Sequence, residues 1–139
     1  MSVRILLDTS IIIDNLACRD EHGESLQVLD LCENGVLEGI ITTVTVMDTM
    51  YTMRKHLKPA EARNAVQILL QIVGVVPVLR SDLNAALTGD SPDFEDAVQA
   101  SCAARVKADY ILTRNVGAFK RSFVPAVVPG DFLRMLKSI

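Results

Sequence analysis

The sequence has no tryptophan, only three cysteines and only two histidines. The cysteines, Cys18, Cys32 and Cys102, are odd in number, widely spaced and without a C-x-x-C pair, so we expect them to be reduced and buried. The histidines, His22 and His56, have no metal-ligand spacing to each other or to a cysteine, so we expect both on the surface. These absences argue against a disulfide-stapled fold and against a zinc protein.

The sequence also lacks a hydrophobic run as long as the ~18 residues of a membrane span. The strongest apolar stretch, VQILLQIVGVVPVL at 66–79, is interrupted by Gln71, Gly74 and Pro77. The N-terminal MSVRILLDTSIIID contains Asp8 and is followed by no small-residue cleavage site, so we do not expect a secretory signal. We therefore predict a cytoplasmic protein that does not enter the membrane.

Half of the 139 residues are hydrophobic, which is enough for one domain, residues 1–139, with its own core. The net charge of −3 argues against a uniformly cationic surface for nucleic acid. The charge is unevenly distributed: residues 1–100 carry seven basic and fifteen acidic residues, and residues 101–139 carry seven basic and two acidic ones. An acidic site beside a basic flank is one interpretation, and basic residues that solvate helix faces are the other.

Short apolar runs alternate with longer amphipathic segments along the whole chain. The apolar runs, which we interpret as buried strands, lie at 3–8, 39–43, 75–79, 109–113 and, more weakly, 126–128. The amphipathic segments lie directly after Asp8 and at 24–34, 45–56, 59–73, 92–107 and 129–138. This alternation predicts an α/β domain of three layers, α/β/α, with a central parallel sheet.

Ligands bind at the carboxyl ends of the strands in such sheets, so polar residues at those ends are the candidates for a site. Asp8 ends the first run; because Thr9 and Ser10 could cap the following helix, we favour a functional role for its carboxylate. Thr113 and Asn115 end the fourth run. We therefore expect these side chains to meet at one edge of the sheet.

Two amphipathic segments supply further carboxylates. Asp48 is the only acidic residue in TTVTVMDTMYT, where the spacing of Val44, Met47 and Tyr51 predicts a buried face beside it. A functional Asp48 and a solvent-facing one are both compatible with this pattern.

In SPDFEDA, at 91–97, a helix that starts near Ser91 and Pro92 places Asp93 and Asp96 on one face and points Glu95 elsewhere. Asp93 could instead be the N-cap. Carboxylates ~4 Å apart repel by roughly 4 kcal/mol at an effective dielectric constant of about 20, so their convergence would require a proton or a cation. Oxygen ligands without histidine or thiolate suit Mg²⁺ or Mn²⁺.

The segments LLDTSIIID, ITTVTVMDTMYTMRK, DFEDAVQASCAARVKADYILTRN and VPAVVPGDFL resemble the PIN domain family, in particular the small bacterial type related to VapC-type toxin ribonucleases. The resemblance implies a parallel sheet of about five strands and a Mg²⁺- or Mn²⁺-dependent ribonuclease, in which a metal-activated water hydrolyses the RNA phosphodiester. It matches Asp8 and Asp96 to metal-binding aspartates and Asp48 to a second acidic position. Asp93 would be an auxiliary ligand.

The sequence departs from the family pattern at two positions. Asn115 stands where many relatives have a fourth aspartate, and Ala118 replaces another aspartate, so the site has fewer anionic ligands. We interpret Asn115 as a residue that orients water or phosphate. Ser10 and Thr113 either do the same or satisfy backbone groups at helix and strand ends.

The resemblance also suggests partners. We expect an RNA substrate, a small antitoxin protein that covers the acidic groove, and a homodimer. Arg114, Lys120 and Arg121 are candidates for holding the RNA backbone. Two other interpretations remain open: a weakened PIN domain that binds RNA or protein without cleavage, and a receiver-like domain that is phosphorylated on Asp8 or Asp48.

Overall fold

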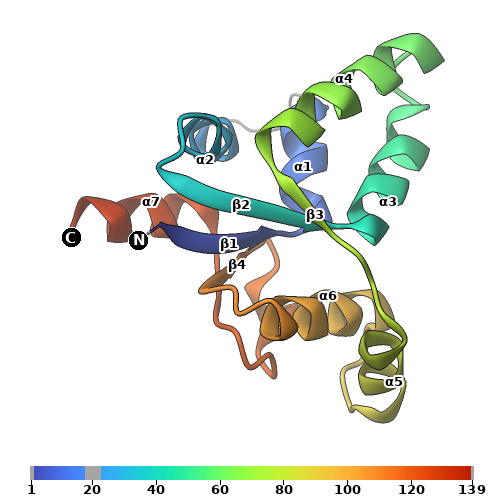
Figure 1. Ribbon diagram of the computed structural model, residues 1–139, viewed down its shortest axis with the longest axis vertical. Coiled ribbons are helices and arrows are strands. Elements are labelled where there is room, and N and C mark those ends of the chain that lie inside the picture. Colours follow the sequence, from blue (N-terminus) through green and yellow to red (C-terminus); the bar gives the residue numbers. More distant parts are fainter. Residues whose placement is uncertain (1, 18–22, 139) are drawn as a thin grey trace.

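The computed structural model describes residues 2–17 and 23–138 and has a five-stranded parallel sheet at its centre (Figure 1). The strands lie in the order β3-β2-β1-β4-β5. Their bounds are β1 Val3–Leu7, β2 Leu37–Thr42, β3 Gly74–Val76, β4 Tyr110–Leu112 and β5 Ala126–Val127. The predicted α/β fold with about five parallel strands is confirmed.

Helices cover both faces of the sheet, as Figure 1 shows for α1, α2 and α4 on one side and α5 and α6 on the other. The helices are α1 Thr9–Leu16, α2 Glu24–Glu33, α3 Thr43–Met53, α4 Pro59–Ile72, α5 Arg80–Thr88, α6 Phe94–Arg105, the 3₁₀ helix η1 Val116–Phe119 and α7 Pro129–Lys137. One apolar core joins the sheet to α1, α2, α4 and α7. The second core joins it to α5, α6 and the segment around Phe119.

Local sequence signals account for several helix ends. Pro59 and Pro129 occupy first-turn positions of α4 and α7, where a missing N–H has no cost. Gly35 follows α2 with φ of +77°, the left-handed conformation that glycine adopts without strain after a helix.

Cys32 and Cys102 are buried free thiols, as expected, and His56 is exposed. Burial raises the pKa of each of these thiols to about 11, so both are unreactive. Cys18 and His22 lie outside the described residues. In the described part of the chain, no helix is long and apolar enough to cross a membrane.

The sequence predictions omitted one helix and were wrong about the buried face of another. Helix α5 was not predicted: Leu83, Ala86 and Leu87 follow helical spacing, but the segment has only nine residues and its first turn is polar. The face of α3 expected to be buried is the exposed one: Met47 is 70% and Tyr51 60% exposed. Thr45, Thr49 and Met53 are buried instead, so two of the three buried residues of α3 carry hydroxyl groups, which a search for apolar periodicity overlooks.

Candidate functional site

The strand order reverses between β1 and β4, and Asp8 lies at the carboxyl end of β1 at this point. Open parallel sheets bind ligands at such a switch point, because the connections leave the sheet in opposite directions there. The Asp8 backbone N–H donates to the carbonyl of Leu112 at the end of β4 (2.9 Å), which fixes the main chain. The residue is the N-cap of α1, and only 8% of it is exposed.

Two hydroxyl groups hold the Asp8 carboxylate. Ser10 Oγ donates to Oδ2 over 2.8 Å, and Thr113 Oγ1 donates to the same oxygen over 2.9 Å. Thr113 is fully buried and also accepts the Asn115 N–H (3.1 Å). Ser10 and Thr113 therefore orient Asp8, and its Oδ1 has no hydrogen bond within the described residues.

We predict that Thr113→Val lowers the free energy of unfolding by about 1–2 kcal/mol, because it leaves the Asn115 N–H and the Asp8 carboxylate each short of one partner. Urea unfolding followed by circular dichroism measures the change. Thr113→Ser keeps the hydroxyl and serves as the control. Equal losses in the two variants would contradict the role assigned to the hydroxyl.

Asp96 approaches Asp8 from α6. The Asp93 side chain caps this helix by accepting the Asp96 N–H (2.9 Å), so the N-cap interpretation of Asp93 is confirmed and the helix begins at Phe94 rather than at Pro92. Burial, followed by the negative charges of Asp93 and Asp8, raises the pKa of Asp96 to about 6. The two carboxylates predicted to form the site therefore interact electrostatically.

The carboxyl group of Asp48 on α3 also interacts with that of Glu95 on α6. This interaction with Asp48, then burial and the charges of Asp93 and Asp96, raise the pKa of Glu95 to about 8. Glu95 is exposed, as expected of a surface residue, but the prediction that it points away from the site is wrong. The sequence carried no signal for this contact, because it depends on how α3 meets the start of α6.

These raised pKa values predict a pH-dependent stability without divalent ions. The folded protein retains protons on Asp96 and Glu95 that the unfolded chain has already lost, so unfolding becomes easier as pH rises from about 4.5 to about 8. In EDTA, we expect the melting temperature to fall between pH 5 and pH 8.5. Glu95→Gln should flatten the upper part of this curve, and a melting temperature that rises over the range would contradict the assignment.

The next two positions are those at which the sequence departs from the family pattern, Asn115 and Ala118. Asn115 is exposed and precedes η1, and its side chain makes no capping hydrogen bond. Ala118 and Asp96 both line a pocket of about 160 Å³ beside the carboxylates. Position 118 therefore borders the site, and the alanine leaves space where a carboxylate would add negative charge.

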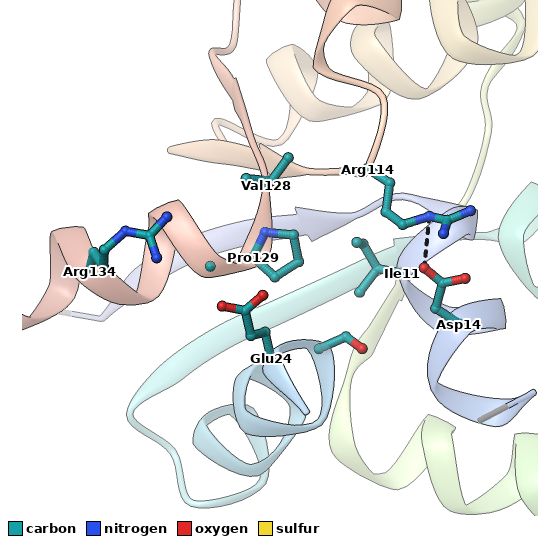
Figure 2. A pocket seen from close by; sticks show the side chains of 9 residues that line it. Ile11, Asp14, Glu24, Arg114, Val128, Pro129 and Arg134 are labelled. Carbon is teal, nitrogen blue, oxygen red and sulfur yellow. Dashed lines mark ion pairs between the residues drawn. The ribbon is translucent and has the colours of Figure 1, made fainter. Parts of the chain in front are cut away.

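The basic residues predicted to hold RNA differ in their surroundings. Arg114 Nε pairs with Asp14 Oδ2 over 2.8 Å, and Figure 2 shows the guanidinium turned towards this buried carboxylate of α1. Both residues line a pocket of about 480 Å³ between α1, α2 and α7 that the site carboxylates do not line. Arg121 pairs with Asp90 at the surface. Lys120 is exposed and has no ion pair in the part of the chain that the structure describes.

The donor chemistry of the site fits a hard divalent cation. Its side chains offer carboxylate oxygens, and the repulsion among them is the kind that a cation relieves. In the described ranges, no three histidine, cysteine, aspartate or glutamate side chains form a ready-made metal cage. Mg²⁺ does not require one, since it commonly retains waters and binds one or two carboxylates together with phosphate oxygens.

Comparison with known proteins agrees with this class of α/β domain. The PIN domain family model matches residues 4–117, and the chain belongs to the PIN domain family. No curated protein matches the chain.

Solved structures share the fold. VapBC2 from Rickettsia felis, bound to a DNA fragment from its promoter, gives a TM-score of 0.70 at 17% identity, covering 91% of this chain and 98% of the other. VapBC-1 from nontypeable Haemophilus influenzae gives 0.70 at 18% identity, covering 92% and 99%. VapC20 from Mycobacterium tuberculosis, a toxin that cleaves the sarcin–ricin loop, gives 0.60 at 17% identity, covering 77% and 86%.

Proposed function

We propose that this PIN domain is a Mg²⁺- or Mn²⁺-dependent ribonuclease and the toxin of a toxin–antitoxin pair. The proposal is supported by Asp8 at the switch point of the sheet and by the effect of its charge on the pKa of Asp96, a carboxyl group from a different element. Among the similar structures are VapBC complexes and a VapC toxin that cleaves a specific RNA loop. A small antitoxin and a homodimeric assembly belong to the same proposal.

In this proposal, each residue of the site has a separate role. Asp8 and Asp96 hold the cation, Asp48 and Asp93 stand beside them as auxiliary carboxylates, and Ser10 and Thr113 keep Asp8 oriented. When bound, the cation supplies Lewis-acid polarisation of the phosphodiester and of water. Asn115 and Lys120 are exposed, so they would be available to contact the RNA backbone.

The experiment is an RNA cleavage assay with Mn²⁺, Mg²⁺ or EDTA. We expect cleavage with either metal and none in EDTA. Asp96→Asn should abolish it, whereas the matched control Asp30→Asn, on the exposed surface of α2, should not. Cleavage that persists in EDTA or in Asp96→Asn would overturn the proposal.

A second function is favoured by one specific observation: Asn115 and Ala118 bring no carboxylate to the edge of the site. A PIN domain with too few ligands for catalysis would act as an RNA- or protein-binding module. Metal-dependent thermal stabilisation and RNA retention without cleavage products would support this second function.

A further inference from the structure

Three polar side chains form a closed triangle in the interior next to the carboxylate site. Gln99 Nε2 donates to Thr45 Oγ1 over 2.8 Å and makes a longer contact of 3.4 Å with Thr9 Oγ1. The two threonine hydroxyls are 2.8 Å apart and hydrogen-bonded to each other. Gln99 and Thr45 are completely buried. The triangle therefore joins α1, α3 and α6 at one point.

Each corner of this triangle lies close in sequence to a carboxylate of the site. Thr9 follows Asp8 directly. Thr45 precedes Asp48 by three residues on α3, and Gln99 follows Asp96 by three residues on α6. Residues three apart lie on the same face of a helix. A displacement at any corner would therefore move a carboxylate.

The helices joined by the triangle bring negative charges together, and these charges repel. The hydrogen bonds of the triangle hold the three helices together against this repulsion and add no charge of their own. Their lengths and directions restrict the relative positions of the helices. Apolar packing is not directional in this way. An apolar side chain of the same size could fill the volume without fixing the relative positions of the helices.

One atom of the Gln99 side chain lowers the stability of the fold instead of raising it. Its Oε1 is buried and has no hydrogen-bond partner within the described residues. If the amide were turned over, its NH₂ group would occupy that position instead, so one amide atom stays unpaired in either orientation. A buried unpaired polar atom destabilises the fold, whereas an apolar side chain of similar shape would not. The two threonine hydroxyls would remain bonded to each other without Gln99.

We propose that Gln99 is a positioning residue, which acts through Thr9 and Thr45 to hold Asp8, Asp48 and Asp96 at the spacing that a divalent cation requires. The inference rests on the proposed function. It assigns to a buried glutamine, three residues after Asp96 on α6, the part that outer-shell partners have in metal sites.

The test compares Gln99→Met with the wild type in three measurements: the melting temperature in EDTA, the Mn²⁺ affinity by calorimetry, and the rate of RNA cleavage at saturating Mn²⁺. We expect an unchanged or higher melting temperature together with a roughly 10-fold to 100-fold loss of Mn²⁺ affinity or cleavage rate. Gln67→Met makes the same chemical change on the exposed face of α4 and should alter none of the three.

A second pair of variants covers the case in which Gln99→Met also lowers the melting temperature. Thr45→Val removes the hydroxyl from the triangle, and Thr45→Ser keeps it. Wild-type Mn²⁺ affinity in the serine variant and weakened affinity in the valine variant support the proposal. Equal effects of valine and serine overturn it.

The remaining outcomes separate this inference from the proposed function. A Gln99→Met variant that binds Mn²⁺ and cleaves RNA as the wild type does overturns the positioning role and leaves the ribonuclease proposal standing. A wild-type protein that neither binds Mn²⁺ nor cleaves RNA overturns both, and is recognised without any variant.

Discussion

Asp8→Asn is expected to reduce RNA cleavage at least ~100-fold while leaving the fold intact. The substitution removes one of the two carboxylates that would hold the cation, and losing several kcal/mol of charge stabilisation corresponds to this factor. The asparagine keeps the shape of the side chain and can still accept the hydrogen bonds from Ser10 and Thr113. Initial cleavage rates at saturating Mn²⁺ measure the effect.

Two further measurements distinguish this explanation from simple unfolding. The Asp8 charge contributes to the raised pKa of Asp96, so the variant should move the Asp96 pKa from about 6 towards its usual value, which NMR titration detects. The melting temperature in EDTA should be unchanged or higher, because a source of repulsion is gone. A variant that cleaves RNA as fast as the Asp30→Asn control would contradict the role of Asp8.

The largest effect on stability is expected from Asp82→Ala, because the Asp82 side chain joins α5 to α6. Asp82 is 1% exposed and accepts hydrogen bonds from the Leu79 N–H (2.9 Å), Ser101 Oγ (2.8 Å) and Arg105 Nη2 (3.0 Å). Breaking a buried ion pair costs roughly 3–5 kcal/mol; we expect about 3 kcal/mol because the Arg105 side chain is 29% exposed. The melting temperature should fall by about 10 °C.

A surface ion pair provides the control for Asp82→Ala. Asp90 pairs with Arg121, and both side chains are more than half exposed, so Asp90→Ala should cost less than about 0.5 kcal/mol. Urea unfolding of the two variants gives the comparison. A loss below about 1 kcal/mol in Asp82→Ala would show that the buried pair contributes little.

Asp82 should also make the free energy of unfolding depend on pH. Burial raises the pKa of Asp82, but the hydrogen bonds from Arg105, Leu79 and Ser101 outweigh burial and hold that pKa below its usual value. A lowered carboxyl pKa contributes stability above the usual pKa, and this contribution is lost as pH falls through the folded-state pKa. The stability difference between the wild type and Asp82→Ala should therefore shrink in acid.

The sequence was informative where a local pattern determines structure. Continuous apolar runs predicted the parallel strands, and their polar ends placed Asp8 and Thr113 at one edge of the sheet, where they are hydrogen-bonded. The acidic start of α6 predicted Asp93 as a possible cap, and Asp93 is the N-cap. The family motifs were correct as well, since the PIN domain model covers most of the chain.

The features that sequence reasoning missed depend on contacts between distant elements. Helix α5 is held in place by the bond between Asp82 and Arg105, and no period within 80–88 reveals that bond. The contact between Glu95 and Asp48 requires α3 to lie over the start of α6. Gln99 resembles any polar residue of an amphipathic helix until the structure shows that it is buried.

The central claim is that the Asp8 and Asp96 carboxylates form a divalent-cation site, and Mn²⁺ binding followed by electron paramagnetic resonance tests it without any assumption about the substrate. The free Mn²⁺ signal reports how much ion the protein has removed from solution. The account predicts saturable loss of this signal with the wild type and none with the Asp8→Asn/Asp96→Asn double variant. Equal binding by the two proteins, or no binding by the wild type, would contradict it.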